Sequence, residues 1–133
     1  MSDSEKLIKK LQMTPHPEGG HFKESYRDKN ISLIYYLLKK NEKSHWHRLT
    51  KNEILHFYDG DPLIVSLSKN GIDMHEIILN NSEDQLSHFV VNRGTWFSMK
   101  TKGEYSLIGC TVSPPFDDND FELAPKEWEP KKS

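Results

Sequence analysis

The chain has 133 residues, a formal net charge of -2 and a pI near 6.4, with 35% hydrophobic and 29% charged residues. This length predicts one domain with a single core, and the six Phe, five Tyr and three Trp residues argue against disorder. The absence of a basic stripe and of a long apolar run argues against nucleic acid or a membrane as a partner.

The N-terminal residues 3–13 are predicted to form a short amphipathic helix. Leu7, Ile8 and Leu11 make one apolar stripe, and Ser4 is the expected N-cap. Two prolines within residues 14–17 end the helix, and residues 18–20 (Glu-Gly-Gly) indicate a turn. This charged segment does not resemble a signal peptide and Cys110 is the only cysteine, so we expect a reducing, cytoplasmic setting.

From residue 20 onward the pattern is that of short β-strands. Asn70-Gly71 is a typical hairpin turn, and no helical pattern interrupts the series. The expected strands are 21–27, 31–38, 44–48, 54–58, 63–68, 74–79, 87–91, 95–99 and 105–112. Such a series is typical of a β-sandwich or barrel. We therefore predict one all-β domain over residues 1–133, with a barrel at 20–112.

The remaining residues, 113–133, are rich in proline and acidic side chains. We expect this tail to pack on the barrel through its apolar residues, which are Phe116, Phe121, Leu123 and Trp128. The last four residues are expected to fray. The acidic run at 117–122 lacks the spacing of a calcium loop and is most simply a solvated segment.

The most informative motif is His45-x-His47, followed after five residues by Glu53 and after six more by Gly60. On a regular strand the two histidines share one face, and a carboxylate returning after a turn reaches that face. Two imidazoles and a carboxylate can bind a divalent transition metal, with Fe, Mn, Ni or Zn as candidates. They can equally form an acid–base pair, with His47 and Glu53 as catalytic groups.

This motif resembles the first motif of the cupin superfamily of jelly-roll barrels. The His-to-Glu spacing is longer than in the usual cupin pattern, and Lys39 stands where a glycine is expected. The second cupin motif is degraded, because its metal-binding histidine falls on Phe97, which cannot ligate a metal. The resemblance thus implies at most three of the usual four ligands.

A narrower resemblance, to the fifth cupin family, covers nearly the whole chain. It is carried by the segments 16–20 (His-Pro-Glu-Gly-Gly), 46–48, 56–63, 109–112 and 120–124. It implies an antiparallel cupin-type jelly-roll β-barrel with a short N-terminal helix, and a homodimer in which strands cross between subunits. It leaves the function open.

Strand parity assigns further residues. Glu53, Leu55 and Phe57 share the expected pocket side, which places His56 on the opposite layer. Glu24 and Arg27, in the opening motif, face opposite sides of a regular strand or form a surface ion pair.

The candidate ligand-binding residues are Glu24, Tyr35, Phe57, His88 and Trp96. The aromatic ones are equally explained as core, and His88 as a surface position. Cys110 lies in an apolar strand and is expected to be a buried, inert thiol.

Two functions follow from these residues. The first is an enzyme acting on a small polar molecule, such as a sugar- or nucleotide-linked metabolite, with chemistry of the epimerase or isomerase kind or dependent on a metal. The second is a module that binds or senses a metabolite without chemistry, which the degraded second motif favours. A weaker third is an iron dioxygenase-like cupin, which needs His45, His47 and Glu53 on one face of an octahedron. A pocket filled by Phe57, Trp96 and Phe97 would argue against catalysis.

Overall fold

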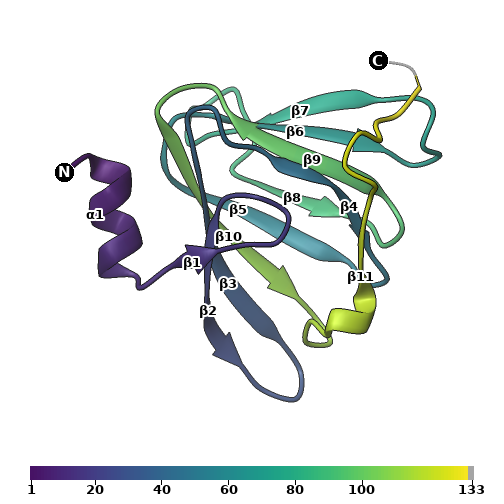
Figure 1. Ribbon diagram of the computed structural model, residues 1–133, viewed down its shortest axis with the longest axis horizontal. Helices are drawn as coiled ribbons and strands as arrows, with labels where there is room; N and C mark the ends of the chain where they lie inside the picture. The colour runs from purple at the N-terminus through teal and green to yellow at the C-terminus, as the bar shows by residue number, and fades with distance from the viewer. Residues whose placement is uncertain (132–133) are drawn as a thin grey trace.

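The computed structural model describes residues 1–131 and consists of two antiparallel β-sheets packed face to face, with one helix at the N-terminus (Figure 1). This is the predicted cupin-type jelly-roll architecture. Residues 132 and 133, which belong to the end expected to fray, lie outside the described residues.

The first sheet has six strands in the order β1-β2-β3-β10-β5-β8. Their bounds are β1 Thr14–Pro15, β2 His21–Arg27, β3 Ser32–Lys39, β10 Tyr105–Val112, β5 Glu53–Gly60 and β8 His88–Val91. The second sheet has five, in the order β11-β4-β9-β6-β7. Their bounds are β11 Phe121–Leu123, β4 Ser44–Leu49, β9 Trp96–Thr101, β6 Leu63–Ser68 and β7 His75–Leu79. All nine expected strands are present, and Asn70-Gly71 lies between the paired strands β6 and β7.

Helix α1 (Asp3–Lys10) is shorter than predicted and begins at a different cap. Ser2, not Ser4, is the N-cap, and its hydroxyl accepts the Glu5 N–H while the Glu5 carboxylate accepts the Ser2 N–H. The helix stops after Lys10, before the backbone of Gln12 turns to a positive φ of 56°. Its apolar stripe packs beside Met13, Leu37 and Leu107 on the outside of the first sheet.

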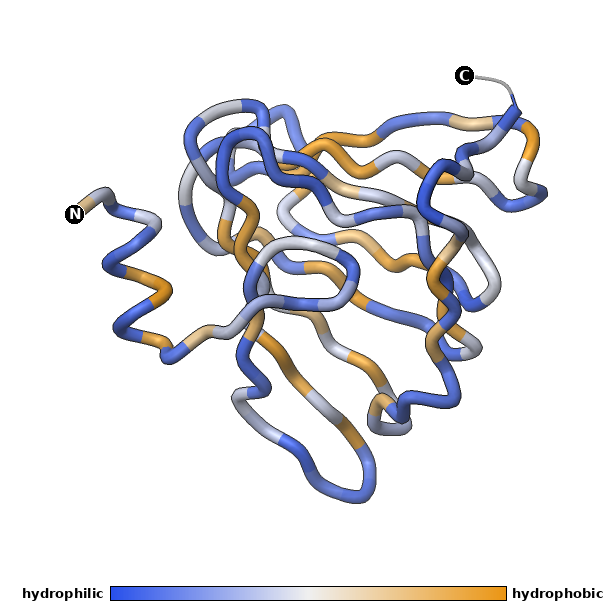
Figure 2. The backbone as a smooth tube through the Cα atoms, viewed as in Figure 1, coloured by the Kyte–Doolittle hydropathy of each residue, from blue (hydrophilic) through white to orange (hydrophobic). Residues whose placement is uncertain are grey.

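The main core lies between the two sheets, where alternate side chains of each strand point inward. Its fully buried members include Tyr36, Leu55, Val65, Phe97 and Ile108. Figure 2 shows hydrophobic segments along the strands and hydrophilic ones in the connecting loops. Inward-facing residues thus fill most of the sandwich with apolar side chains.

Two irregularities in the strands decide what faces the interior near one end. The β2–β3 register shifts between Glu24 and Tyr26, and the β4–β9 register shifts between Ser44 and His47. Each shift breaks the period-two alternation, so Glu24 and Arg27 come to the same side and His45 and His47 come to opposite sides.

The C-terminal tail lies along the second sheet, as expected. After the 3-10 turn η1 (Asp118–Asp120), β11 pairs with β4 (Figure 1). Trp128 packs against Trp96 and Trp46. Both β11 and η1 were missed at the sequence level. In the described part of the chain, no helix has the length and apolar character needed to cross a membrane.

Candidate functional site

A cavity of about 270 Å³ opens between the sheets at the end where β11 and η1 cross them. Its walls are largely apolar and include Phe22, Ile34, Val112, Phe116 and Phe121. The polar side chains of the lining gather in two places. An imidazole–carboxylate cluster lies at the inner wall, and a set of charged side chains lies at the rim. A concave, mostly apolar space with few convergent polar groups is the usual form of a small-molecule site.

His47, on β4, is the central imidazole of this cavity and is only 2% exposed. Its Nδ1 lies 2.7 Å from the carbonyl oxygen of His45, which can only accept, so Nδ1 carries the proton. The neutral ring therefore presents a bare Nε2 lone pair toward Glu18, whose Oε2 lies 3.5 Å away. Burial lowers the pKa of His47, and the neighbouring Glu53 carboxyl acts against that shift.

Glu18 enters the cavity from the loop between β1 and β2. Gly19 and Gly20 follow it with φ of 112° and 78°, and a side chain at Gly20 would meet the Leu37 carbonyl oxygen at 2.9 Å. The Tyr36 hydroxyl donates to the Gly19 carbonyl and fixes this turn. The Glu18 side chain is 8% exposed, and its Oε2 has no hydrogen-bond partner among the described residues.

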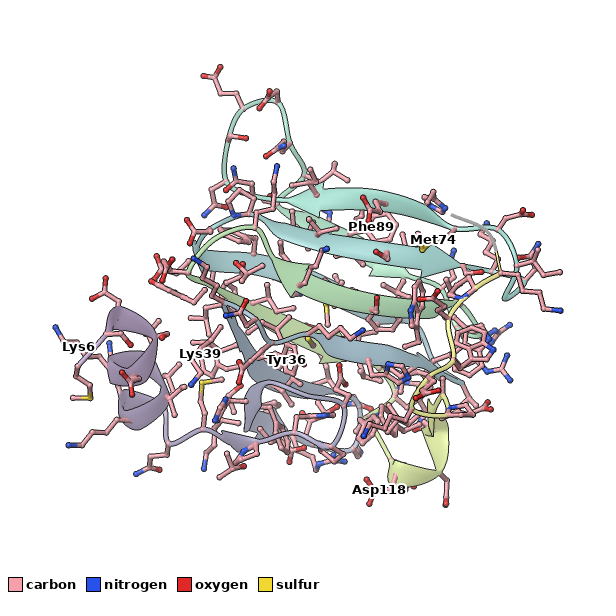
Figure 3. All side chains as sticks on the ribbon, turned by 45° about the horizontal axis from the view of Figure 1, so that its top comes forward. Lys6, Tyr36, Lys39, Met74, Phe89 and Asp118 are labelled. Atoms are coloured by element: carbon pink, nitrogen blue, oxygen red, sulfur yellow. The ribbon has the colours of Figure 1, made fainter. Side chains whose placement is uncertain are left out.

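Burial raises the pKa of Glu18 from an ordinary 4.5 to about 7, against an opposing effect of His16. Tyr36, labelled in Figure 3, is buried, and its side chain lies near this carboxyl. The carboxyl is therefore close to half-protonated at neutral pH.

His16 is a second imidazole beside Glu18, with its side chain 14% exposed. Its Nδ1 accepts the Glu18 backbone N–H at 3.0 Å, so the proton of the neutral ring sits on Nε2. Burial lowers the pKa of His16, and the neighbouring Glu18 carboxyl acts against that shift. Edge-on contacts with Phe22 and Tyr36 hold the ring in place.

Glu53, at the start of β5, is the second buried carboxyl. Burial raises its pKa to about 7, His47 acts against this, and Glu18 adds to it as a like charge. Cys110 on β10 pairs in register with Leu55 and lies beside the Glu53 carboxyl. Its thiol is buried as predicted, and burial raises its pKa well above the usual value.

The rim carries one bidentate ion pair and one free acid. Arg27 donates from Nε and Nη2 to the two Glu24 oxygens at 3.0 and 2.8 Å. Asp118 of η1 lies across the opening, and Figure 3 shows it at the edge of the molecule. The β2 bulge places Glu24 and Arg27 on one side, so of the two expectations for this pair, opposite faces was wrong and the ion pair is observed.

His45 is not part of this cluster, which corrects the predicted trio of His45, His47 and Glu53. The shift in β4 turns its ring outward, where Nε2 lies 2.9 Å from the Pro125 carbonyl oxygen of the tail. Within residues 1–131, no three His, Cys, Asp or Glu side chains are placed to hold a metal ion. Phe97, in the position of the fourth cupin ligand, packs on His47 with ring centroids 4.1 Å apart. The residues present therefore do not fit the cupin metal site.

Of the five predicted ligand-binding residues, the cavity contains only Glu24. Tyr35 and His88 face outward from the first sheet. Both lie in register with the outward-facing His56, His88 directly and Tyr35 through Gly109 of the strand between them. Phe57 is in the main core, and Trp96 packs between Trp128 and the Arg48 guanidinium. The parity assignment of β5 was right for Glu53, Leu55 and Phe57, all of which are buried.

Two polar residues of the site, His16 and Glu18, were not among the predicted site residues. Their segment was interpreted as a turn, because two glycines follow Glu18. The available signal in the sequence was a carboxylate directly before two glycines. In the structure these glycines have positive φ, and Gly20 lies close to the backbone of strand β3.

Residues 5–124 match the protein family described as Cupin superfamily (DUF985). The chain belongs to this cupin family. This confirms the predicted resemblance, and the cavity is the interior of the cupin barrel. A search of curated proteins found no match.

The cupin chain is similar to solved structures along nearly its whole length. Protein SO0799 from Shewanella oneidensis is 33% identical, with a TM-score of 0.89 over 96% of this chain and 87% of that one. A hypothetical protein from Leishmania major is 28% identical, with a TM-score of 0.81 over 96% and 90%. An oxalate decarboxylase from Bacillus subtilis shares the fold at 13% identity, with a TM-score of 0.67 over 85% of this chain and 32% of that one.

Proposed function

We propose that this cupin binds a small polar molecule in the cavity and moves protons on it, as an isomerase or epimerase does. The observation that carries the proposal is the fixed tautomer of His47, whose bare Nε2 faces the Glu18 carboxyl at 3.5 Å inside a largely apolar cavity. A neutral imidazole beside a carboxyl whose pKa is raised to about 7 is an arrangement suited to acid–base catalysis.

The roles follow from the protonation states. The neutral His47 is the base that takes a proton from the substrate through Nε2. Glu18 and Glu53, each with a pKa raised to about 7 by burial, are populated in both forms at neutral pH. A protonated carboxyl gives a proton to the substrate, and the carboxylate accepts it again when His47 returns its own. The aromatic walls exclude water from this exchange.

The experiment uses deuterium exchange, because it reports proton transfer before the natural substrate is known. Short-chain hydroxy ketones, aldoses and their amino-substituted counterparts are incubated with the protein in D2O, and proton NMR follows loss of the C–H signal next to the carbonyl. We expect exchange with the wild type and its loss in His47→Gln, while the exposed His75→Gln variant on β7 exchanges as the wild type does.

Two alternatives are separated by the same panel. Saturable binding without exchange in any compound would favour a module that binds or senses a metabolite. A metal-dependent reaction, including the dioxygenase kind, predicts that His45→Gln removes activity as fully as His47→Gln does. The proton-transfer proposal predicts that His45→Gln keeps it, because the His45 ring contacts the Pro125 carbonyl and the orienting group for His47 is the His45 backbone.

We further propose that the protein is a homodimer that pairs through the outer face of the first sheet. This face carries Tyr58 and Val90, which are 49% and 42% exposed, beside Tyr35, Ile54 and His56. The rings of Tyr35 and Tyr58 pack edge to face with centroids 5.9 Å apart. An exposed surface with several apolar and aromatic side chains across neighbouring strands of a sheet is typical of a subunit interface.

A further inference from the structure

We infer that the cavity takes a ligand with a protonated amino group attached to an apolar body, in preference to an alcohol or an anion of the same shape. The inference names the ligand class of the proposed proton-transfer site and rests on that proposal for taking the cavity as the working site. Three features of the cavity lining support it: the excess of acidic side chains, the fixed tautomers of His16 and His47, and the Glu18 oxygen without a hydrogen-bond partner among the described residues.

The first observation is an excess of acids around the space. Glu18 and Glu53 lie in the inner wall, and Glu24 and Asp118 lie at the rim. Arg27 is the one Arg or Lys side chain among the described lining residues, and Glu24 holds it through two short hydrogen bonds. The carboxylates Asp117 and Asp118 act on the same guanidinium. Arg27 is thus already neutralised and offers little to a phosphate or carboxylate ligand.

The second observation is that the two lining histidines carry no positive charge. His16 uses Nδ1 to accept a backbone N–H, and His47 is buried with its single proton committed to a carbonyl. Burial lowers the pKa of both rings. An anion entering the cavity would therefore meet buried carboxyls and neutral imidazoles, and the one cation among the described lining residues, Arg27, is already paired with Glu24.

The third observation is the unpartnered acceptor. Glu18 Oε2 is buried without a hydrogen-bond partner in the described chain, and it lies beside the bare Nε2 of His47. These atoms favour a ligand that donates hydrogen bonds, and an ammonium donates three. The remaining walls, with Phe116 and Phe121, suit an apolar body and offer ring faces to a cation.

Such a ligand has a signature that neutral compounds lack. A cation next to Glu18 and Glu53 stabilises their ionised forms, so binding near neutral pH releases protons from them. The groups facing Glu18 are His16, Ser44 and Tyr36, and those facing Glu53 are His47, Cys110 and Glu18 itself. Because none of these is a cation, the incoming ammonium becomes the first positive charge that the two carboxyls meet.

The test is isothermal calorimetry near neutral pH in two buffers of different ionisation enthalpy. The probes are cyclohexylamine and benzylamine, their matched alcohols cyclohexanol and benzyl alcohol, the anion benzoate, and Zn²⁺ or Mn²⁺ alone. We expect the amines to bind about tenfold tighter than the alcohols, which is the effect of one charge-assisted hydrogen bond. We also expect buffer-dependent heats that report proton release, and no binding of benzoate.

Variants separate this inference from the proposed catalysis. Glu18→Gln and Glu53→Gln keep the shape of the side chain and should each reduce both the amine preference and the proton release. Glu76→Gln, an exposed acid on β7, should change neither. The wild type separates the two proposals, because wild-type protein that binds amines with proton release but exchanges no C–H proton in D2O would refute the catalytic proposal alone.

Three outcomes would overturn the inference. Alcohols that bind as tightly as the amines would show that charge does not matter. Benzoate binding would show an anion site. Tight binding of Zn²⁺ or Mn²⁺, with no heat from either amine, would assign the carboxyls to a metal ion.

Discussion

Replacing Glu18 by glutamine should stabilise the fold, and more so at high pH than at low pH. In the folded protein, burial raises the pKa of Glu18 from 4.5 to about 7. The folded state therefore binds more protons than the unfolded state between these two values, so the free energy of unfolding falls as pH rises through this range. The stability linked to this carboxyl is fully present below about pH 4.5 and is lost above about pH 7.

The size of the effect follows from the shift. A difference of about 2.5 pKa units corresponds to about 3 kcal/mol of unfolding free energy between the two ends of the range. Glutamine keeps the shape of the side chain but does not titrate. The advantage of Glu18→Gln over the wild type should therefore grow by up to about 3 kcal/mol from about pH 4.5 to about pH 8.

Urea denaturation at several pH values measures this difference directly. Glu24→Gln is the matched control, because hydrogen bonds from Arg27 lower the pKa of the largely exposed Glu24, and its variant should show no growing advantage toward high pH. A difference between Glu18→Gln and wild type that is constant from about pH 4.5 to about pH 8 would show that the carboxyl is not held neutral by burial, and would remove the main support for its role as an acid.

Three further predictions concern the surface, the tail and the metal question. Val90→Lys should shift the protein toward monomer in light scattering after size-exclusion chromatography, while Ile72→Lys, in the exposed β6–β7 turn, should not; a monomeric wild type would refute the dimer. Trp128→Ala should cost about 2 kcal/mol in thermal or urea unfolding, because the indole packs on two other tryptophans; an unchanged midpoint would show that the tail is not held there. Elemental analysis of untagged protein should show no metal that depends on His47 and Glu53, and near one metal per chain that is lost in a His47→Ala/Glu53→Gln variant would contradict this.

The sheets were predictable because their signals are local and repeated. Strands such as β6 and β10 alternate or run apolar between clear turn residues, and the expected bounds of both were exact. Strand β5 is regular from Glu53 to Phe57, so counting by twos correctly assigned its buried face. Helix α1 was found, but its cap was misplaced by two residues because Ser2 and Ser4 are both good caps.

The site was less predictable because bulges and a loop build it. One shift in β4 turns His45 toward the C-terminal tail, so that His47 is the one histidine of the His45-x-His47 motif in the cavity. One shift in β2 brings Glu24 and Arg27 together. Nothing in the residue types marks where these shifts fall, since they depend on pairing with β9 and β3. Glu18 was missed for a related reason, because its place is set by a glycine turn packed under Tyr36.

These shifts explain why a chain with a cupin motif lacks the cupin ligand set. His45 leaves the interior, and the neighbour of His47 is instead the Glu18 carboxyl, which comes from the β1–β2 loop of the other sheet. The His47 imidazole and the Glu18 carboxyl face each other in a largely apolar space, where burial disfavours the charged form of each. Under the proposed function these groups act as an acid–base pair, and the loss of His45 from the interior follows from one extra residue in β4 rather than from a new residue type.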